Sequence, residues 1–403
     1  MNSALKNYAT YVNNKIDVCE ISLNQYISTD NILQNKQGIE CAASLPIQGG
    51  KVTAFKKGDI LLANIRPYLK KIWYAQFDGG CSADVLAIRA NAKIDSHFLF
   101  YALFRDDFFI HAMKGSKGTK MPRGDKSQIM EFKIPVFNPK TQQSIAAVLS
   151  ALDKKIALNK QINARLEEMA KTLYDYWFVQ FDFPDTNGKP YKSSGGEMVF
   201  DETLKREIPN GWEVKSLGEI ENNIITGKTP STQYSNFFNG DIPFITIGDI
   251  RNNTFIIKTE QNLSIEGANN QKNKYLPEGS LCVSCIATVG LIGFTTRQAQ
   301  TNQQINSIIF KHDYNKEFLY FYLKDYFLVG KAKTGNTFAN MNKGDFEKIL
   351  VLYPNLKLLQ KYSNKMVLVF NQINNLSKQN HQLTQLRDFL LPMLMNGQVS
   401  VAE

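Results

Sequence analysis

The feature that most constrains the fold of this chain is that its sequence repeats itself. Shifted by 220 residues, Phe98-Leu99 matches Phe318-Leu319, and Gly124-Asp125 matches Gly344-Asp345. Further pairs at this offset are Leu103 with Leu323, Gly115 with Gly335, Met121 with Met341, and Ile129 with Ile349. Gly58 pairs with Gly279 at an offset of 221, and Ile134-Pro135 matches Tyr353-Pro354. Because a repeat sets the architecture of a chain, two copies of one structural plan are expected.

Each copy opens with a strand-rich region and closes with a long helix. Short β-branched runs between Gly, Asn and Pro residues, as in 240–250 and 280–294, are typical of strands. Short helices are expected around Ser96–Phe109 and Lys316–Lys331, and helical periodicity extends from Thr141 to Trp177. The sequence therefore predicts an α+β fold with two similar strand-rich α/β domains.

Both long helices carry the spacing of a coiled-coil seam, with steps of three and four residues. The first seam is Ile145, Leu149, Leu152, Ile156, Asn159, Asn163, Leu166, Ala170, Leu173 and Trp177. The second is Leu359, Tyr362, Met366, Val369, Ile373, Leu376, Asn380, Leu383, Leu386 and Leu390. Two such helices in one chain most simply pair as an antiparallel coiled coil, which gives the repeat a pseudo-twofold character. The alternative is that each helix packs on its own domain.

Polar residues at the middle of the seams are expected to fix the helix register, since they lower stability but select one alignment. These are Asn159 and Asn163 in the first helix and Asn380 and His381 in the second, with Asn163 corresponding to His381. The expected domains are residues 1–138, a spacer helix over 139–180, a linker and second domain over 181–354, a second spacer helix over 355–396, and a tail over 397–403.

The charge balance favours a polyanionic partner. Lys and Arg number 47 against 37 Asp and Glu, a formal charge of +10, which suits nucleic acid; the alternative is a merely basic surface. Cys282 and Cys285 form a C-x-x-C within an apolar, β-branched run, which favours buried strand thiols over a redox or zinc pair. With neither a signal peptide nor an apolar stretch of membrane-spanning length, the expected location is cytoplasmic.

Searches for catalytic motifs find no convincing site. Residues 226–231, TGKTPS, lack the first glycine of a phosphate loop, and the four histidines show no metal-ligand spacing. Asp185, Glu213 and Lys215 can be fitted to a metal-dependent nuclease pattern, but Asp185 lies in a Gly- and Pro-rich connection. We therefore expect no catalytic or metal-ligating residues, and keep a stand-alone nuclease and a coiled-coil, protein-binding scaffold as alternatives.

Several long segments resemble the specificity subunits of Type I restriction-modification systems. Residues 158–184, LNKQINARLEEMAKTLYDYWFVQFDFP, look like the central conserved region, and 383–399, LTQLRDFLLPMLMNGQV, look like the C-terminal conserved helix. IPNGWEVKSLGEI at 208–220 and ITGKTPST at 225–232 resemble the opening of a target-recognition domain. The first half lacks that opening, and its GGCSADV (79–85) and GTKMPRGDK (118–126) resemble another subtype of recognition domain.

The resemblance implies two target-recognition domains that bind the two halves of a split target in double-stranded DNA, with the helices setting their spacing. It also implies that two modification subunits dock on the chain and bring S-adenosylmethionine and an adenine methyltransferase site. Restriction subunits would add ATP- and Mg-dependent translocation and cleavage, so this chain needs no cofactor of its own. Docking helices are expected to expose apolar residues such as Trp177, Phe178 and Phe389.

The expected DNA contacts are basic or amide side chains in glycine-rich loops. The first loop offers Lys114, Lys117, Lys120, Arg123 and Lys126, and its counterpart offers Lys331, Lys333, Asn336, Asn340 and Lys343. Further candidates are Arg66, Lys70, Lys71, Thr226, Lys228 and Thr229. Arg123 is expected to read a base, because its fork can donate twice to guanine, whereas asparagines suit adenine. The alternative for the first loop is a solvated loop without a ligand.

Overall fold

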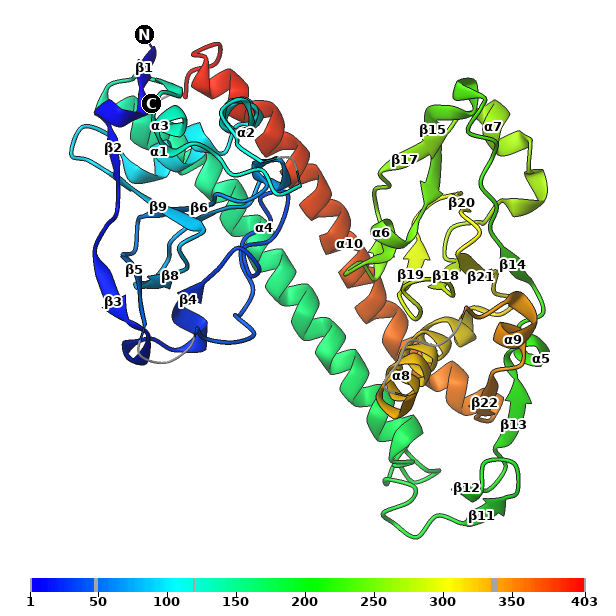
Figure 1. Cartoon of the computed structure of the whole chain (residues 1–403). Helices are drawn as coiled ribbons and strands as arrows, with labels where there is room; N and C mark the ends of the chain where they lie inside the picture. Colours follow the sequence, from blue (N-terminus) through cyan, green and yellow to red (C-terminus); the bar gives the residue numbers. More distant parts are fainter. Residues whose placement is uncertain (1, 47–49, 119, 335–339, 402–403) are drawn as a thin grey trace. The chain divides into compact units, whose positions relative to one another are not determined.

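The computed structural model describes residues 2–46, 50–118, 120–334 and 340–401, and it divides into two compact units. Unit 1 comprises Met1–Ile156 and Gln382–Glu403, and unit 2 comprises Ala157–His381. Segments from the beginning and the end of the chain therefore share unit 1 (Figure 1). The two long helices each contribute to both units.

Unit 1 is built on an antiparallel sheet in the order β2-β9-β6-β7. Its strands are β2 (Ala9–Tyr11), β9 (Val85–Ala90), β6 (Ile60–Ala63) and β7 (Ile72–Tyr74). Every residue of β6 is buried, as its continuous apolar run requires. Helices α1 (Ser96–Leu103) and α2 (Asp106–Lys114) pack into the same core, and Asp95 caps α1 by accepting the Phe98 amide.

A second sheet in unit 1 has the order β3-β5-β8-β4. Its strands are β3 (Lys15–Asp17), β5 (Lys51–Phe55), β8 (Gly79–Cys81) and β4 (Tyr26–Ile27). Glycine is required in β8, because a Cβ on Gly79 would lie 2.2 Å from the carbonyl oxygen of Gln25. The remaining elements are β1 (Asn2–Ala4) paired with β10 (Lys133–Pro135), α3 (Lys126–Met130), and the short helices η1 (Leu5–Asn7), η2 (Val18–Glu20), η3 (Leu23–Gln25) and η4 (Pro67–Leu69).

Unit 2 repeats the main sheet of unit 1 and adds one strand. The order is β14-β21-β18-β19-β16, in which β16 pairs parallel with β19. The strands are β14 (Ile224–Thr226), β21 (Ile305–Ile308), β18 (Leu281–Ser284), β19 (Ile292–Thr295) and β16 (Phe255–Ile256). A smaller sheet has the order β17 (Gln261–Leu263), β15 (Phe238–Ile245) and β20 (Gln300–Thr301). The same plan thus builds both main sheets.

Short elements complete unit 2. The paired strands are β13 (Glu213–Ser216) with β22 (Leu350–Tyr353), and β11 (Met198–Asp201) with β12 (Arg206–Pro209). The helices are α5 (Leu217–Ile220), α6 (Ile247–Ile250), α7 (Ile265–Asn269), α8 (Lys316–Thr334), α9 (Lys343–Glu347), η6 (Ser235–Phe237), η7 (Lys272–Lys274) and η8 (Asp313–Asn315).

The structure corrects part of the sequence alignment between the repeats. In α1 and α8 the offset of 220 holds, because Phe98 and Phe318 both begin the helix core and are fully buried. From α3 onward the offset is 217, since Asp125 and Asn342 are the N-caps of equivalent helices. Ile129 therefore corresponds to the buried Phe346 rather than to Ile349. The second repeat is thus three residues shorter than the first at this point. The difference falls in a glycine-rich loop, where no apolar periodicity marks a gap.

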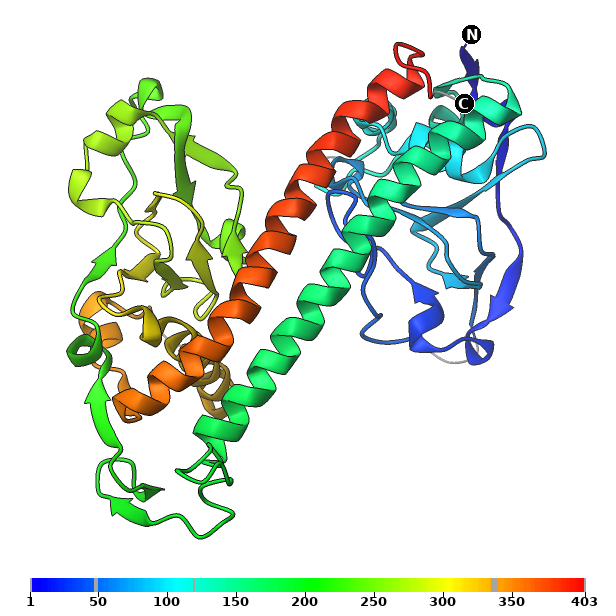
Figure 2. The same cartoon turned by 180° about the vertical axis from the view of Figure 1, so that it is seen from behind.

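The long helices are α4 (Pro139–Tyr174) and α10 (Leu356–Met395). Asn138 and Asn355 cap their first turns through Oδ1, which accepts the amides of Thr141 and Leu358. Within unit 2 the two helices lie side by side and antiparallel, as Figures 1 and 2 show. After Tyr174 the chain continues as a π-helical turn, η5 (Asp175–Val179), which turns Trp177 and Phe178 into the core of unit 2. The expectation that these two residues are exposed is wrong, whereas Phe389 is 62% exposed.

Two seam assignments also change. The caps at Asn138 and Asn355 are 217 residues apart, so Asn163 corresponds to Asn380 and not to His381. Leu386 is exposed, and Arg387 faces α4 in its place. Asn159 Nδ2 donates to Gln379 Oε1 at 2.6 Å, and Asn163 Nδ2 donates to Ser377 Oγ at 3.1 Å. Polar side chains therefore do meet in the middle of the helix pair.

Candidate nucleic-acid interface

The first predicted loop folds into a narrow basic hairpin in unit 1, which we call the basic finger (residues 117–123, Thr119 lying outside the described residues). The backbone N–H groups of Lys117 and Arg123 each donate to the other residue's carbonyl at 2.9 Å. Gly118 takes a φ of +93°, which suits glycine at the turn. Lys117, Lys120 and the large apolar Met121 are exposed on the finger.

The finger is fixed to the end of strand β6 by backbone hydrogen bonds. The Arg66 amide donates to the Pro122 carbonyl at 2.7 Å, and the Gly124 amide donates to the Asn64 carbonyl at 3.0 Å. Gly124 packs closely there, since a Cβ would lie 2.9 Å from Asn64 Oδ1 and that side chain would have to shift. The predicted contacts Arg66 and Arg123 are thereby brought onto adjacent segments.

Arg123 forms an ion pair with Asp84, which lies between β8 and β9. The Arg123 Nη2 and Asp84 Oδ1 atoms are 2.9 Å apart, and the side chains are 60% and 37% exposed. Such accessible pairs contribute little to stability, so both groups remain available to a ligand. Lys117 lies 3.8 Å from Asp125, whose pKa is lowered mainly by the backbone N–H bonds it accepts as the cap of α3.

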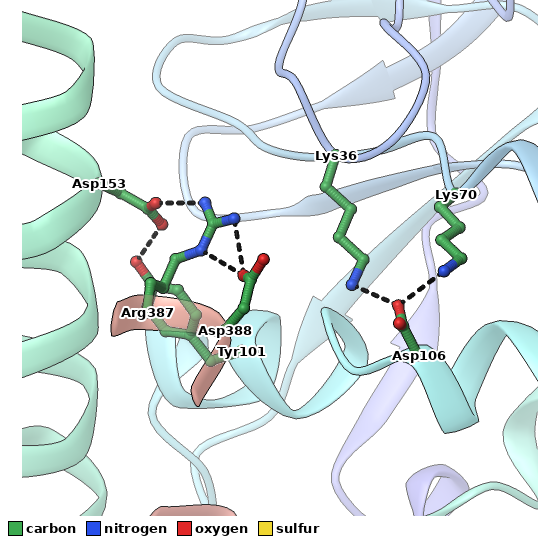
Figure 3. A network of polar contacts seen from close by, with 7 residues as sticks. All are labelled: Lys36, Lys70, Tyr101, Asp106, Asp153, Arg387 and Asp388. Atoms are coloured by element: carbon green, nitrogen blue, oxygen red, sulfur yellow. Dashed lines mark hydrogen bonds and ion pairs between the residues drawn. The ribbon is translucent and has the colours of Figure 1, made fainter. Parts of the chain in front are cut away.

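The other predicted cations of unit 1 differ in whether they are exposed or bonded to another group of the protein. Lys114 and Lys126, at the end of α2 and the start of α3, are exposed. Lys71 donates to the carbonyl of Thr29, and Lys70 lies 3.0 Å from Asp106. Figure 3 shows Lys70 and Lys36 both directed at that carboxylate. Burial alone would raise the pKa of Asp106, but the hydrogen bonds from the two lysines hold it below its ordinary value.

An apolar hollow lies beside these cations. It has a volume of about 510 Å³ and is lined by Tyr68, Lys70, Asp106, Phe109, Ile110, Met113 and Lys114. Tyr68 is 50% exposed and available to a ligand, whereas Trp73 is buried in the core.

In unit 2 the predicted residues Thr226, Lys228 and Thr229 lie along strand β21 and the loop Asn302–Gln304 that precedes it, which was not among the predicted contacts. Thr226 Oγ1 donates to Asn306 Oδ1 at 2.7 Å, and Thr229 Oγ1 donates to Gln303 Oε1 at 2.6 Å. Lys228 is exposed. The loop Asn302–Gln304 corresponds to Ser82–Asp84, because Asn64 and Cys285 donate to the carbonyls of Asp84 and Gln304 in the same way. Its run of amides was the only signal in the sequence.

The second predicted loop is described in part. Asn340 is exposed, and the adjacent Met341 amide donates to the Cys285 carbonyl at 2.9 Å. Lys343 lies 3.3 Å from Glu347 on the same helix face. Asn336 lies outside the described residues, and Lys331 and Lys333 belong to α8 but their side chains are not described.

The structure describes all three residues of the nuclease alternative. Asp185 Oδ1 accepts the amides of Asn187 and Lys189 in its own loop, whereas Glu213 and Lys215 pair with each other at 2.5 Å. In the described ranges, no group of three or more His, Cys, Asp or Glu residues is arranged to hold a metal ion.

Burial raises the pKa of Cys282 to about 12 and that of Cys285 to about 11, which fits buried thiols. None of the helices, over the described residues, has the length and apolarity to cross a bilayer.

The family model for the Type I restriction modification DNA specificity domain matches residues 4–168 and 209–385. These matches cover most of the chain, once in each repeat, so the chain belongs to this family, the non-catalytic specificity subunits of Type I restriction-modification systems. The Type I restriction enzyme HindI specificity subunit of Haemophilus influenzae is 34% identical over 93% of this chain and 94% of its own length. The MjaIX specificity subunit of Methanocaldococcus jannaschii is 30% identical over 87% of this chain and 79% of its own length.

The fold is also that of a solved relative. The crystal structure of the Type I restriction-modification system S subunit from M. genitalium superposes with a TM-score of 0.55 at 16% identity, covering 98% of this chain and 96% of that chain.

Proposed function

We propose that this specificity subunit binds a two-part DNA sequence, with one half-site read by each recognition domain. The recognition domains are assigned to residues 1–138 and 181–354, the spacer helices to 139–180 and 355–396, and the tail to 397–403. The observation that carries the proposal is the basic finger, which holds Arg123 and two exposed lysines, Lys117 and Lys120, at the end of strand β6. Lysines suit phosphates, and an oriented arginine suits a base edge.

The two half-sites are proposed to differ in sequence. Unit 1 offers cations around the finger, whereas unit 2 offers hydroxyl and amide groups at Thr226, Thr229 and Gln303. Amide side chains suit adenine, and arginine suits guanine. Because the antiparallel helices carry polar contacts in the middle of their seam, we propose that they fix the spacing between the half-sites.

We further propose that modification subunits dock on α4, two of them per chain, and that restriction subunits join them. An apolar stripe on the exposed side of α4 supports this, and its members are Leu158, Ile162 and Met169. The spacing of four and seven residues keeps all three on one helix face. S-adenosylmethionine, ATP and Mg would be held by these partners, and the complex would act on DNA in the cytoplasm.

Methylation mapping tests the proposal. Cells expressing this chain with its modification subunit should carry methylated adenines within one split sequence. Replacing residues 114–126 should alter one half and leave the other intact, because each repeat supplies its own reader. A single continuous target, or simultaneous change of both halves, would contradict the two-domain proposal. Metal-dependent cutting by the purified chain, abolished by Glu213→Ala, would instead support the nuclease alternative.

A further inference from the structure

Three segments of unit 1 converge at the base of the basic finger. The Asn64 amide donates to the Asp84 carbonyl at 2.8 Å, and the Asn64 carbonyl accepts from Gly124 at 3.0 Å. The Arg66 amide donates to the Pro122 carbonyl. We call Asn64, Arg66, Ser82, Asp84 and Arg123 the reading cluster, since these neighbouring segments carry all five.

The cluster contains polar atoms that the protein itself does not satisfy. Asn64 Oδ1, Arg66 Nε and Ser82 Oγ are buried without a hydrogen-bond partner. Within the described part of unit 1, these are the three side-chain polar atoms that are buried and have no hydrogen-bond partner. An unpaired buried polar group costs free energy. Buried polar groups therefore usually have a hydrogen-bond partner, and unpaired ones are rare. All three atoms lie on the converging segments that also carry Asp84 and Arg123.

The backbone of the cluster is strained in the same place in both repeats. Arg66 and Lys70 have φ values of +51°, and the equivalent residues Ala287 and Gly290 have values of +65° and +86°. Left-handed conformations are costly for arginine, lysine and alanine, and persist where the surroundings impose them, often at ligand sites. The turn is therefore a fixed part of the recognition domain, and its side chains are what differ between the repeats.

Charge decides between a base edge and a phosphate as the ligand of Arg123. Asp84 lies 2.9 Å from the guanidinium and would repel a phosphate oxygen. The edge of a G·C base pair presents both hydrogen-bond acceptors and a donor. Guanine offers O6 and N7 as acceptors, and cytosine offers its N4 amino group as a donor next to O6. An arginine beside a carboxylate matches that pattern.

We propose that Arg123 and Asp84 together read one G·C pair in the half-site of unit 1. Arg123 donates to guanine O6 and N7, and the Asp84 carboxylate accepts from cytosine N4. The backbone amides of Asn64 and Arg66, which donate to the carbonyls of Asp84 and Pro122, hold the segments that carry the two reading side chains. In the absence of DNA, the ion pair keeps both side chains oriented. The inference rests on the proposed function, since it assumes that unit 1 reads DNA.

The test is methylation mapping with the full chain and its modification subunit. Arg123→Gln should shift one position of one half-site from G·C towards A·T, because glutamine suits adenine. Asp84→Asn should weaken discrimination at that same position by roughly ten- to a hundred-fold. Glu131→Gln is the matched control, because it removes the exposed Lys6–Glu131 pair of unit 1 and should leave the target unchanged.

A double variant separates reading from folding. If the pair is only structural, exchanging its charges in Asp84→Arg with Arg123→Asp restores the original target, which overturns the proposal. If the pair reads DNA, the exchange does not restore the original target, while urea unfolding of the single and double variants stays close to that of the wild type because the accessible pair contributes little to stability. An unchanged target in both single variants, or a wild-type half-site without a G·C pair, also overturns it. Loss of a two-part target in the wild-type complex would instead refute the proposed function.

Discussion

Arg387 shows how one residue ties α10 into unit 1. Its guanidinium lies 2.8 Å from Asp153 on α4, and Asp153 also accepts from the Tyr101 hydroxyl (Figure 3). The guanidinium also lies 4.8 Å from the centre of the Phe104 ring. The Arg387 side chain is only 11% exposed. An apolar-pattern search selects Leu386 instead, because it cannot recognise a cation that is paired within the seam.

Arg387→Ala should destabilise the chain by about 1–3 kcal/mol, since it leaves Asp153 half-buried without its cation. Urea unfolding of the two proteins measures the difference. Arg165→Ala is the control: its pair with Glu168 is exposed, with side chains 83% and 66% accessible, and should cost no more than about 0.5 kcal/mol. Equal effects of the two substitutions would show that the Arg387 contacts are not stabilising.

Glu317 gives unit 2 a pH dependence. Its side chain is buried, and this burial raises its pKa to about 7, although the Ser363 hydroxyl donates to it. A carboxyl group with a raised pKa stabilises the fold while protonated, and that contribution is lost as the pH rises towards and past 7. Glu317→Gln should therefore increase stability at pH 8 by about 1–3 kcal/mol and have little effect below pH ~4.5. Unfolding curves at both pH values test this, and an equal effect at both would contradict it.

At the scale of elements, the features that could be predicted from the sequence are mainly those marked by a regular spacing of apolar residues. The long helices and the burial of Phe98 and Phe318 follow from apolar spacing, and a glycine at position 118 marks a turn. The offset of 217 does not follow, because a three-residue gap in a glycine-rich loop leaves the apolar pattern on either side intact. The Asp84–Arg123 pair was also hidden, since 39 residues separate partners that only sheet formation brings together.

The exposed stripe on α4 is expected to be a docking surface. Ile162→Lys together with Met169→Lys should reduce co-purification of the modification subunit at least tenfold, because each lysine places a charge in an apolar contact. Both residues are exposed, at 36% and 50%, so the fold should tolerate the change. Lys155→Ala on the same helix is the control, because Lys155 is also exposed. Undiminished co-purification would show that the modification subunit docks on another surface.

At the scale of the whole molecule, the two repeats share a main sheet order and a strained turn but present different chemistry. Unit 1 places Arg66 and Lys70 where unit 2 has Ala287 and Gly290. A common scaffold with exchangeable side chains would let one chain recognise the two unlike half-sites proposed above, and it would leave the spacing between them to α4 and α10. The spacing can therefore be altered without changing either reader.

Inserting one heptad after Asn163 and another after Leu376 should lengthen the proposed spacer. Asn163 contacts Ser377, so the two insertions lie at one level of the antiparallel pair and preserve its seam. Seven residues add about 10 Å of helix, and DNA rises roughly 3.4 Å per base pair, so the unread spacer should grow by up to about three base pairs. Three base pairs also rotate the half-sites by about 100°, which is expected to lower activity.

Methylation mapping in cells expressing the variant with its modification subunit reads out the new spacing. The bases in each half-site should stay unchanged, because neither recognition domain is altered. A single insertion is the control: it shifts one helix against the other by two turns on one side of the insertion and breaks the seam there, so it should abolish methylation. An active double variant that still methylates only the original spacing would show that α4 and α10 do not set the distance.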